Sequence, residues 1–415
     1  MQALHIAIIG YGTAGQAAAL LLSRDGHRVE VFEQAPAPGP VGAGFLLQPT
    51  GLQVLWEMGL LGTALAHGRR VRRLYGETAC GRAVMDMRYA GLDARLSGLG
   101  MQRGALFTLL DEAVRGAVAL HAGQAIEAVG DDTRRVRDAR GRWHGPFDLV
   151  IAADGAGSRL RGATRQVKGE AVYPWGALWC LVPQGDWGWG DELRQRYVAA
   201  RKMIGMLPVG TRPGDDTPRL SFFWSLPAGD FDGWQARGLP VWREEIARLW
   251  PDADARLSGI VDAAQLARAT YRDVSVRGWH RDRLVLLGDA AHAMSPQLGQ
   301  GVNMALMDAL ALRDALRAQA GVPAALQAYQ RQRQAHVAVY QFWSRWLTPL
   351  FQSDRDLVAR ARDVAFLPLG RLPGGRGHML RVLSGTQQGF FGKLALKPEF
   401  LEALGDPALP PVGAT

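Results

Sequence analysis

The hydrophobic residues at the start of the chain fall into a strand, a helix and a second strand. Leu4 to Ile9 is a short apolar run rich in isoleucine, which is typical of a buried parallel strand. Thr13 to Arg24 has helical periodicity, and Gly26 stands where such a helix would stop. Arg28 to Phe32 is another apolar run and ends at Glu33. We therefore expect a βαβ unit with a right-handed crossover.

Helical and strand patterns alternate further along the chain. The predicted helices are Pro49 to Leu61, Leu106 to Val118 and Gly301 to Arg317, and the predicted buried strands are Leu149 to Ala153 and Leu284 to Leu287. Such alternation indicates a mixed α/β fold built on a Rossmann-like parallel sheet.

The pattern changes between about Lys168 and Arg272. Short β-like runs such as Ala177 to Val182 and Leu220 to Leu226 are separated by Gly, Pro and Asp turns. We expect a largely antiparallel sheet inserted into the nucleotide domain. Most of its tryptophans we interpret as core and edge packing, although they could also wall a pocket. From about Pro323 onward the chain looks mainly helical.

Composition and charge narrow the class of protein. Hydrophobic residues make up 48% and charged residues 21% of the chain, as in soluble globular proteins. The net charge is +9, but the basic residues are scattered, so we expect no nucleic-acid partner. Cys80 and Cys180 have no metal or CxxC spacing, so we predict reduced thiols, no metal and a cytoplasmic location. The apolar stretch from Leu4 to Leu22 lacks a preceding positive charge, so we do not expect it to be a signal peptide. No stretch of uncharged apolar residues is long enough to span a membrane.

A glycine-rich loop joins the first strand to the first helix. It reads Gly10-Tyr11-Gly12-Thr13-Ala14-Gly15, and Glu33 follows 18 residues after the last glycine. The first glycine permits the turn, the second lets a pyrophosphate approach the backbone, and the third lets the helix pack on the strand. A carboxylate at Glu33 can accept hydrogen bonds from a ribose. The loop predicts a dinucleotide site.

A second loop of this kind follows the strand at Leu284 to Leu287. Gly288-Asp289 stands at the carboxyl end of that strand, where open α/β sheets bind ligands. Asp289 could accept from sugar-alcohol hydroxyls, or it could be only a helix N-cap. Gly299, Gln300 and Gly301 then open a long helix whose N–H groups and dipole would stabilise negative charge.

Together these motifs resemble the class A FAD-dependent monooxygenases of the para-hydroxybenzoate hydroxylase fold. Further matches are Gly42-Ala43-Gly44-Phe45, Gln102-Arg103, the run from Asp148 through Asp154-Gly155 to Arg161, and Gly288-Asp289 with Pro296. The resemblance covers about residues 1–320. It implies that Asp154-Gly155 serves both FAD and the nicotinamide cofactor, and that Asp289 binds the ribityl chain. The expected cofactor-binding residues are Gly10, Gly12, Thr13, Ala14, Gly15, Glu33, Gln34, Gly44, Arg103, Asp154, Gly155, Gly288, Asp289, Pro296, Gly299, Gly301, Val302 and Asn303.

The resemblance also implies a domain division. We assign residues 1–75, 101–167 and 276–330 to the FAD-binding domain. Residues 76–100 and 168–275 are assigned to the substrate domain, and 331–415 to a C-terminal helical region.

The implied reaction uses NADPH or NADH as a transient reductant and O2 as co-substrate. In the family a flavin C4a-hydroperoxide hydroxylates or epoxidises a small aromatic molecule, and the flavin carries the chemistry. The predicted pocket wall, between flavin and inserted sheet, comprises Phe45, Leu47, Met206, Phe222, Trp224, Pro296 and Gln297. Its few polar groups favour an apolar or alkylated aromatic substrate.

Several alternatives remain open. His292 could act in acid/base chemistry, but a histidine in this turn more often orders the loop. The aromatic stretch from Tyr340 to Leu347 could lie on a membrane surface, although a helix packed on the FAD domain is favoured. A flavin-dependent dehydrogenase or reductase, and a non-catalytic flavin-binding sensor, are the competing functions. A monomer and a homodimer are both compatible with the sequence.

Overall fold

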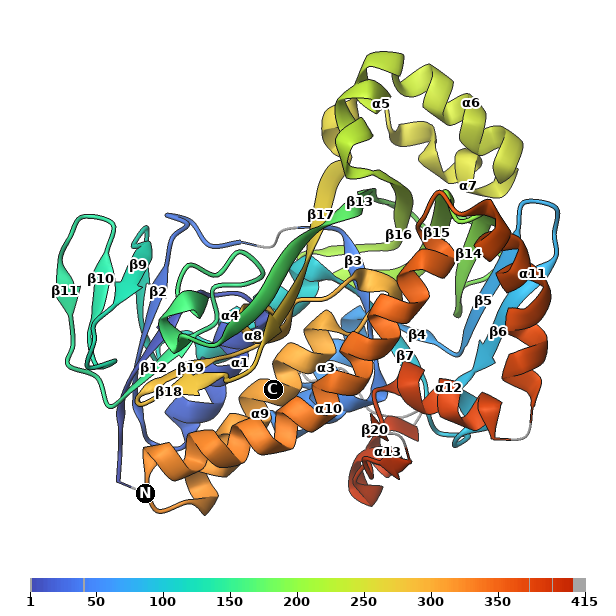
Figure 1. Cartoon of the computed structure of the whole chain (residues 1–415). Coiled ribbons are helices and arrows are strands. Elements are labelled where there is room, and N and C mark those ends of the chain that lie inside the picture. The colour runs from blue at the N-terminus through green and yellow to red at the C-terminus, as the bar shows by residue number, and fades with distance from the viewer. Residues whose placement is uncertain (1, 40–41, 373, 390, 406–415) are drawn as a thin grey trace.

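The parallel sheet forms where the apolar runs predict it (Figure 1). The computed structural model describes residues 2–39, 42–372, 374–389 and 391–405. Its six-stranded sheet has the order β18-β19-β12-β1-β2-β8, and only β18 runs antiparallel to its neighbour. The strands are β1 (His5–Ile9), β2 (Arg28–Glu33), β8 (Ala119–Ala122), β12 (Leu149–Ala152), β18 (His280–Arg281) and β19 (Leu284–Leu286).

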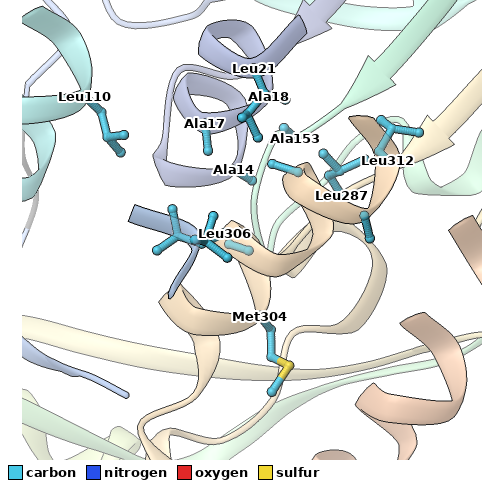
Figure 2. Close-up of a cluster of buried hydrophobic side chains, with 14 of the residues drawn as sticks. Ala14, Ala17, Ala18, Leu21, Leu110, Ala153, Leu287, Met304, Leu306 and Leu312 are labelled. Carbon is cyan, nitrogen blue, oxygen red and sulfur yellow. The ribbon is translucent and has the colours of Figure 1, made fainter. Parts of the chain in front are cut away.

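Small side chains let two helices approach closely over this sheet. Helix α1 (Thr13–Arg24) presents Ala14, Ala17 and Ala18 toward α9 (Gly301–Ala318), whose leucines fill the space (Figure 2). All these residues belong to one buried core. Because helix separation depends on the side chains at the contact, the alanines bring the start of α9 close to the glycine loop. Helix α4 (Arg103–Val114) packs on α1, α2 (Pro49–Glu57) packs on α9, and α3 (Leu61–His67) contacts both α2 and α4. The short helix α8 (Asp289–His292) contacts β17.

A seven-stranded sheet forms the second large element, in the order β17-β13-β16-β15-β14-β5-β6. Only β14 and β5 pair in parallel; the other pairs are antiparallel. The inserted, largely antiparallel sheet is thus present. Its strands are β5 (Arg73–Thr78), β6 (Ala83–Arg88), β13 (Val167–Pro183), β14 (Glu192–Val198), β15 (Lys202–Arg212), β16 (Asp215–Pro227) and β17 (Ala267–Val276).

Two smaller three-stranded sheets are also present; the first contacts β15, and the second lies beside the six-stranded sheet (Figure 1). One has the order β3-β7-β4 and the other β11-β10-β9. Their strands are β3 (Gly44–Leu47), β4 (Arg69–Val71), β7 (Gly98–Gln102), β9 (Ile126–Val129), β10 (Val136–Asp138) and β11 (Trp143–His144).

A helical layer, which the sequence analysis did not predict, covers the outer face of the seven-stranded sheet (Figure 1). It consists of α5 (Phe231–Arg237), α6 (Leu239–Leu249) and α7 (Pro251–Arg256). Trp234, Trp242 and Trp250 belong to this layer and pack in a separate core with the outward-facing residues of β15 and β16. The tryptophans are therefore core residues, because a sheet with one apolar outer face needs a cover.

The C-terminal region is helical and packs along the flavin-motif side of the molecule. Helix α10 (Val322–Phe351) is followed by α11 (Asp356–Arg371), α12 (Gly375–Ser384) and α13 (Pro398–Gly405), with the short strands β20 (Gln387–Gln388) and β21 (Gly392–Lys393) between the last two helices. The boundary predicted between 330 and 331 falls inside α10, which is one continuous helix packed on α9.

Candidate functional site

The three glycines of the first loop lack a side chain for three different reasons. Gly10 has φ +103°, and a Cβ there would lie 2.5 Å from the Ala153 carbonyl oxygen. A Cβ on Gly15 would lie 2.0 Å from the Gly10 carbonyl oxygen, so this glycine is needed for packing. At Gly12 a Cβ would meet nothing within 4 Å. The loop therefore presents open backbone at Gly12, at the uncapped N-terminus of α1, which suits a phosphate group.

Glu33 lies beside this loop at the end of β2. Its carboxylate accepts the backbone N–H groups of Tyr11 and Ala35, each at 2.8 Å. These bonds fix the carboxylate next to the glycine loop and leave one further acceptor position on each oxygen. Gln34, the next residue, is exposed.

The second loop meets the first although the two are far apart in sequence. Gly288 has φ +59°, and a Cβ on it would lie 3.2 Å from the Cβ of Ala14 at the start of α1. Asp289 follows and is exposed although its neighbours Leu287 and Ala290 are buried. A Cβ on Gly301 would lie 3.9 Å from the Asp289 Oδ1 atom, so the carboxylate lies beside the uncapped start of α9.

Arg103 is a cation that interacts with Asp289. It begins α4, more than a third of its surface is accessible, and burial by the surrounding protein nevertheless lowers its pKa. The charge of Arg103 interacts with Asp289 and Tyr271. We use the term cleft for the region between these three side chains, where the resemblance places FAD. The guanidinium carbon also lies 5.6 Å from the ring centre of Phe45.

Tyr271 brings a polar group to this cleft from the substrate sheet. It lies on β17, and its hydroxyl accepts a hydrogen bond from the Trp179 indole N–H at 3.1 Å. Burial raises the pKa of Tyr271, so the phenol stays protonated and can donate at neutral pH. The sequence analysis missed this pair. The available signal was the position of Tyr271 on β17, the last strand of the inserted sheet before the chain returns to the Gly288 motif.

Three of the predicted pocket residues face the wrong way. Met206, Phe222 and Trp224 belong to the outer core, where Phe222 and Trp224 pack against Trp242 of α6. The prediction placed them toward the cleft, but side chains alternate along a strand, and the odd-numbered positions lie on the opposite face, where Phe223 packs against Trp179. Leu47 is also wrong as a pocket residue, because its side chain is fully buried in the main core.

The remaining predicted residues have structural partners as well. Asn303 accepts the Gln48 N–H at 2.8 Å and donates to the Gly299 carbonyl at 3.1 Å, so it holds the turn before α9. The N–H of Gly44 donates to the Ser221 hydroxyl at 3.1 Å, which joins β3 to the substrate sheet. Direct cofactor contacts of these residues, and of all the other predicted cofactor-binding residues, stay predictions. Phe45, Pro296 and Gln297 are partly accessible, as pocket residues must be.

Arg161 joins the Asp154 loop to the Gly288 loop. Its Nε donates to the Ala290 carbonyl at 2.7 Å and its Nη2 to the Ala156 carbonyl at 2.8 Å, while Nη1 pairs with Glu170 of β13 at 2.7 Å. The side chain is almost inaccessible. Asp154 is held by the N–H groups of Arg159 and Leu160 at 2.9 and 3.4 Å, and burial raises its pKa.

His292 is buried behind the second loop. Its Nε2 lies 2.6 Å from Asp308 Oδ2, and the other oxygen of that carboxylate accepts from Arg333 Nε at 2.7 Å. Asp308 Oδ2 also accepts the Gly288 N–H at 2.9 Å. The pKa of Asp308 is about 2, because His292 and Arg333 outweigh the effect of burial, which acts to raise it. With only 2% exposure, His292 orders the loop and does not reach a substrate in the cleft.

The comparisons with known proteins agree with this geometry. A family described as the FAD binding domain matches residues 3–342. A 3-amino-4-hydroxybenzoate 2-monooxygenase of Streptomyces cremeus is 31% identical over 86% of this chain and 92% of its own length. The aurachin C monooxygenase/isomerase of Stigmatella aurantiaca is 29% identical, with 80% of this chain and 85% of its own covered. The crystal structure of Pseudomonas aeruginosa PqsL with 2-aminobenzoylacetate has a TM-score of 0.75 and 26% identity, and the match covers 88% of this chain and all of that one.

The chain therefore belongs to the FAD-dependent monooxygenase family, and its cofactor is FAD. The residues present fit this group, since the backbone at Gly12 is open and the accessible carboxylate of Asp289 lies beside the start of α9 and interacts with the Arg103 guanidinium. Within the described ranges, no group of His, Cys, Asp and Glu side chains could hold a metal ion, and no helix is long and apolar enough to cross a membrane.

Proposed function

We propose that this enzyme hydroxylates a small, electron-rich aromatic compound that carries an amino or hydroxyl group, with NADPH or NADH and O2 as co-substrates. The observation that carries the substrate class is the hydrogen bond from Trp179 to Tyr271, whose phenol also interacts electrostatically with Arg103. A protonated phenol can donate to, and accept from, a ring substituent. The names of the relatives, such as 3-amino-4-hydroxybenzoate 2-monooxygenase, support the same class.

The proposal revises the substrate expected from sequence. The expectation of an apolar or alkylated substrate depended on a pocket wall formed by Met206, Phe222 and Trp224. These three side chains pack in the outer core instead. The opposite face of the sheet carries Trp179 and Tyr271, so an aromatic ring and one hydroxyl are present there, with Phe223 buried against Trp179. A flat ring with a polar substituent suits this combination.

The protein's part in the reaction is binding, orientation and electrostatics. When bound, FAD supplies the redox chemistry that activates O2. The N-terminus of α9, held by the Asn303 bond to Gly299, points backbone N–H groups toward the cleft and would stabilise negative charge there. Asp289 would hold the sugar alcohol of the cofactor. Tyr271 would orient the substrate ring, which must be positioned close to the reacting atom for efficient transfer.

The test is oxidation of NADPH and NADH by the FAD-loaded enzyme in air, with a panel of anilines, phenols and quinolones. The proposal expects one compound to accelerate reductant oxidation strongly and to gain a hydroxyl group. Acceleration without a hydroxylated product would favour a dehydrogenase or reductase. A flavin that no compound makes reducible would favour a sensor and would contradict the proposed function.

A further inference from the structure

The C-terminal helix α12 ends against the loop that opens α9. Gln300, the residue directly before α9, is only 2% exposed. Its amide nitrogen donates to the Leu383 carbonyl at 2.7 Å and, at a longer distance of 3.4 Å, to the Val382 carbonyl. Both carbonyls belong to the last turn of α12. One buried side chain therefore connects α12 to the start of α9.

The direction of this hydrogen bond follows from its partners. The last carbonyls of a helix have no partner within the helix, and Leu383 is the last residue but one of α12. Because a carbonyl oxygen only accepts, the nitrogen of the Gln300 amide must face α12. Loss of this donor would leave a buried acceptor unsatisfied, which costs more than an ordinary hydrogen bond contributes.

The turn after α12 is held by the two helices that also pack on α9. Gly385 has φ +83°, and a Cβ there would lie 2.1 Å from the Oγ1 atom of Thr50 on α2. The Gly385 carbonyl oxygen lies 2.9 Å from the Nε2 atom of His336 on α10. Helices α2 and α10 both pack on α9. A displacement of this turn would therefore reach the start of α9 through Gln300 and through α2.

The start of α9 matters for the charge of the cofactor. The N-terminus of a helix stabilises negative charge within its first turn, and donors that are held in place do so most effectively. Reduced flavin carries more negative charge than oxidised flavin. The match to the FAD binding domain ends at residue 342, so α12 lies outside it although its last turn contacts the flavin loop.

We propose that Gln300 is a positioning residue for the flavin. With the last turn of α12 it fixes the N-terminus of α9, and so strengthens the binding of FAD, that of the reduced form more than that of the oxidised form. Because its amide nitrogen is engaged by α12, Gln300 acts through the backbone of α9. The C-terminal segment 375–389 is thereby a part of the cofactor machinery.

The test measures FAD affinity by flavin fluorescence and the midpoint potential of the bound flavin by equilibration with a reference dye. Gln300→Met keeps the length of the side chain and loses the donor. We expect the FAD dissociation constant to rise about tenfold and the midpoint potential to become more negative, because the reduced form loses more affinity. Gln341→Met is the matched control, since that amide donates to the Val274 carbonyl at 2.8 Å and joins α10 to β17. It should change neither quantity.

Gly385→Ala tests the same contact from the side of α12. Its Cβ would meet Thr50, so the last turn of α12 must move, and we expect both changes seen in Gln300→Met. Gly389→Ala is its control. Gly389 also has a positive φ, +57°, but a Cβ there would meet nothing within 4 Å. The backbone cost is thus similar in the two variants, and Gly389→Ala should leave the flavin unaffected.

Two results would overturn the proposal. One is an unchanged FAD affinity in both Gln300→Met and Gly385→Ala. The other is a weaker affinity with an unchanged midpoint potential, or equal losses in the control variants, since Gln300 would then contribute only to packing. Should Gln300→Met fail to fold, Gly385→Ala and its control decide. None of these outcomes depends on whether the enzyme hydroxylates a substrate.

Discussion

At the scale of single residues, two glycines of one loop differ in what a methyl group would meet. In Gly15→Ala the new Cβ would lie 2.0 Å from the Gly10 carbonyl oxygen, so helix and loop must separate. In Gly12→Ala it enters open space. We expect Gly15→Ala to destabilise the apoprotein by about 2 kcal/mol or more, as overpacked positions do. Gly12→Ala should fold normally and lose FAD affinity, because the methyl group occupies the space proposed for the pyrophosphate.

Thermal denaturation of the apoproteins and flavin titration separate these two effects. Equal apoprotein stability in the two variants would contradict the packing role of Gly15. Unchanged FAD affinity in Gly12→Ala would contradict the placement of the cofactor over this loop.

Tyr271 is the residue on which the substrate class depends. Tyr271→Phe keeps the aromatic ring against Trp179 but removes the hydroxyl group. The Trp179 indole N–H then has lost its hydrogen-bond acceptor. We expect kcat/KM for the accelerating aromatic compound to fall about tenfold or more, as the loss of one hydrogen bond in a buried site does. Steady-state kinetics with Tyr173→Phe, elsewhere on the same sheet, provides the control. Equal kcat/KM in wild type and Tyr271→Phe would remove Tyr271 from the site.

At the scale of elements, Arg161 connects both flavin loops to β13. Arg161→Met would leave the Ala156 and Ala290 carbonyls without their donor and break the pair with Glu170. Removal of one partner of such a buried network costs about 3 kcal/mol or more. Arg272→Met is the matched control, because that arginine pairs with the same carboxylate but is 43% exposed, so its loss should cost about 1 kcal/mol or less. Urea denaturation of the FAD-loaded proteins measures the free energy of unfolding of both variants. A similar loss of unfolding free energy in the two variants would contradict the role given to Arg161.

The sequence predicts elements well where one periodicity is uninterrupted. Helix α1 and strand β2 have the bounds that their apolar patterns indicate, and the glycine and Gly288-Asp289 motifs fix the cofactor. Helices α5 to α7 were missed, because Gly238 and Pro251 divide them into pieces too short to show a clear period. The orientation of β16 was also missed, since both its faces are apolar and a one-residue change of register exchanges them. The interaction of Tyr271 with Arg103 could not be predicted from the sequence, because it depends on how the inserted sheet packs against α4.

At the scale of the whole molecule, the C-terminal helices are joined to the flavin loops by buried charge. Arg333 Nη1 lies 2.8 Å from His336 Nδ1, and His336 Nε2 lies 2.9 Å from the Gly385 carbonyl oxygen. Burial and the neighbouring Arg333 lower the pKa of His336 to about 3. The folded protein therefore keeps this histidine neutral, while the unfolded chain binds a proton below about pH 6.5.

The sign of the pH dependence follows from this difference. His336 contributes stability above about pH 6.5 that is lost progressively as the pH falls toward 3, at up to about 1.4 kcal/mol per pH unit. His336→Gln should be less stable than the wild type at pH 7.5, and the gap should narrow at pH 5. Urea denaturation at both pH values checks this. A difference in unfolding free energy that is the same at pH 7.5 and pH 5 would show that the pKa of His336 does not differ between the folded and the unfolded protein.

The most direct measurement of the central claim is the origin of the oxygen atom in the product. The FAD-loaded enzyme would be run with NADPH or NADH and the accelerating aromatic compound, under O2 enriched in the heavy isotope of oxygen. The account predicts that one labelled oxygen atom appears in the product, since a monooxygenase takes it from O2. An oxidised product without the label would contradict the account and identify a dehydrogenase on the same fold.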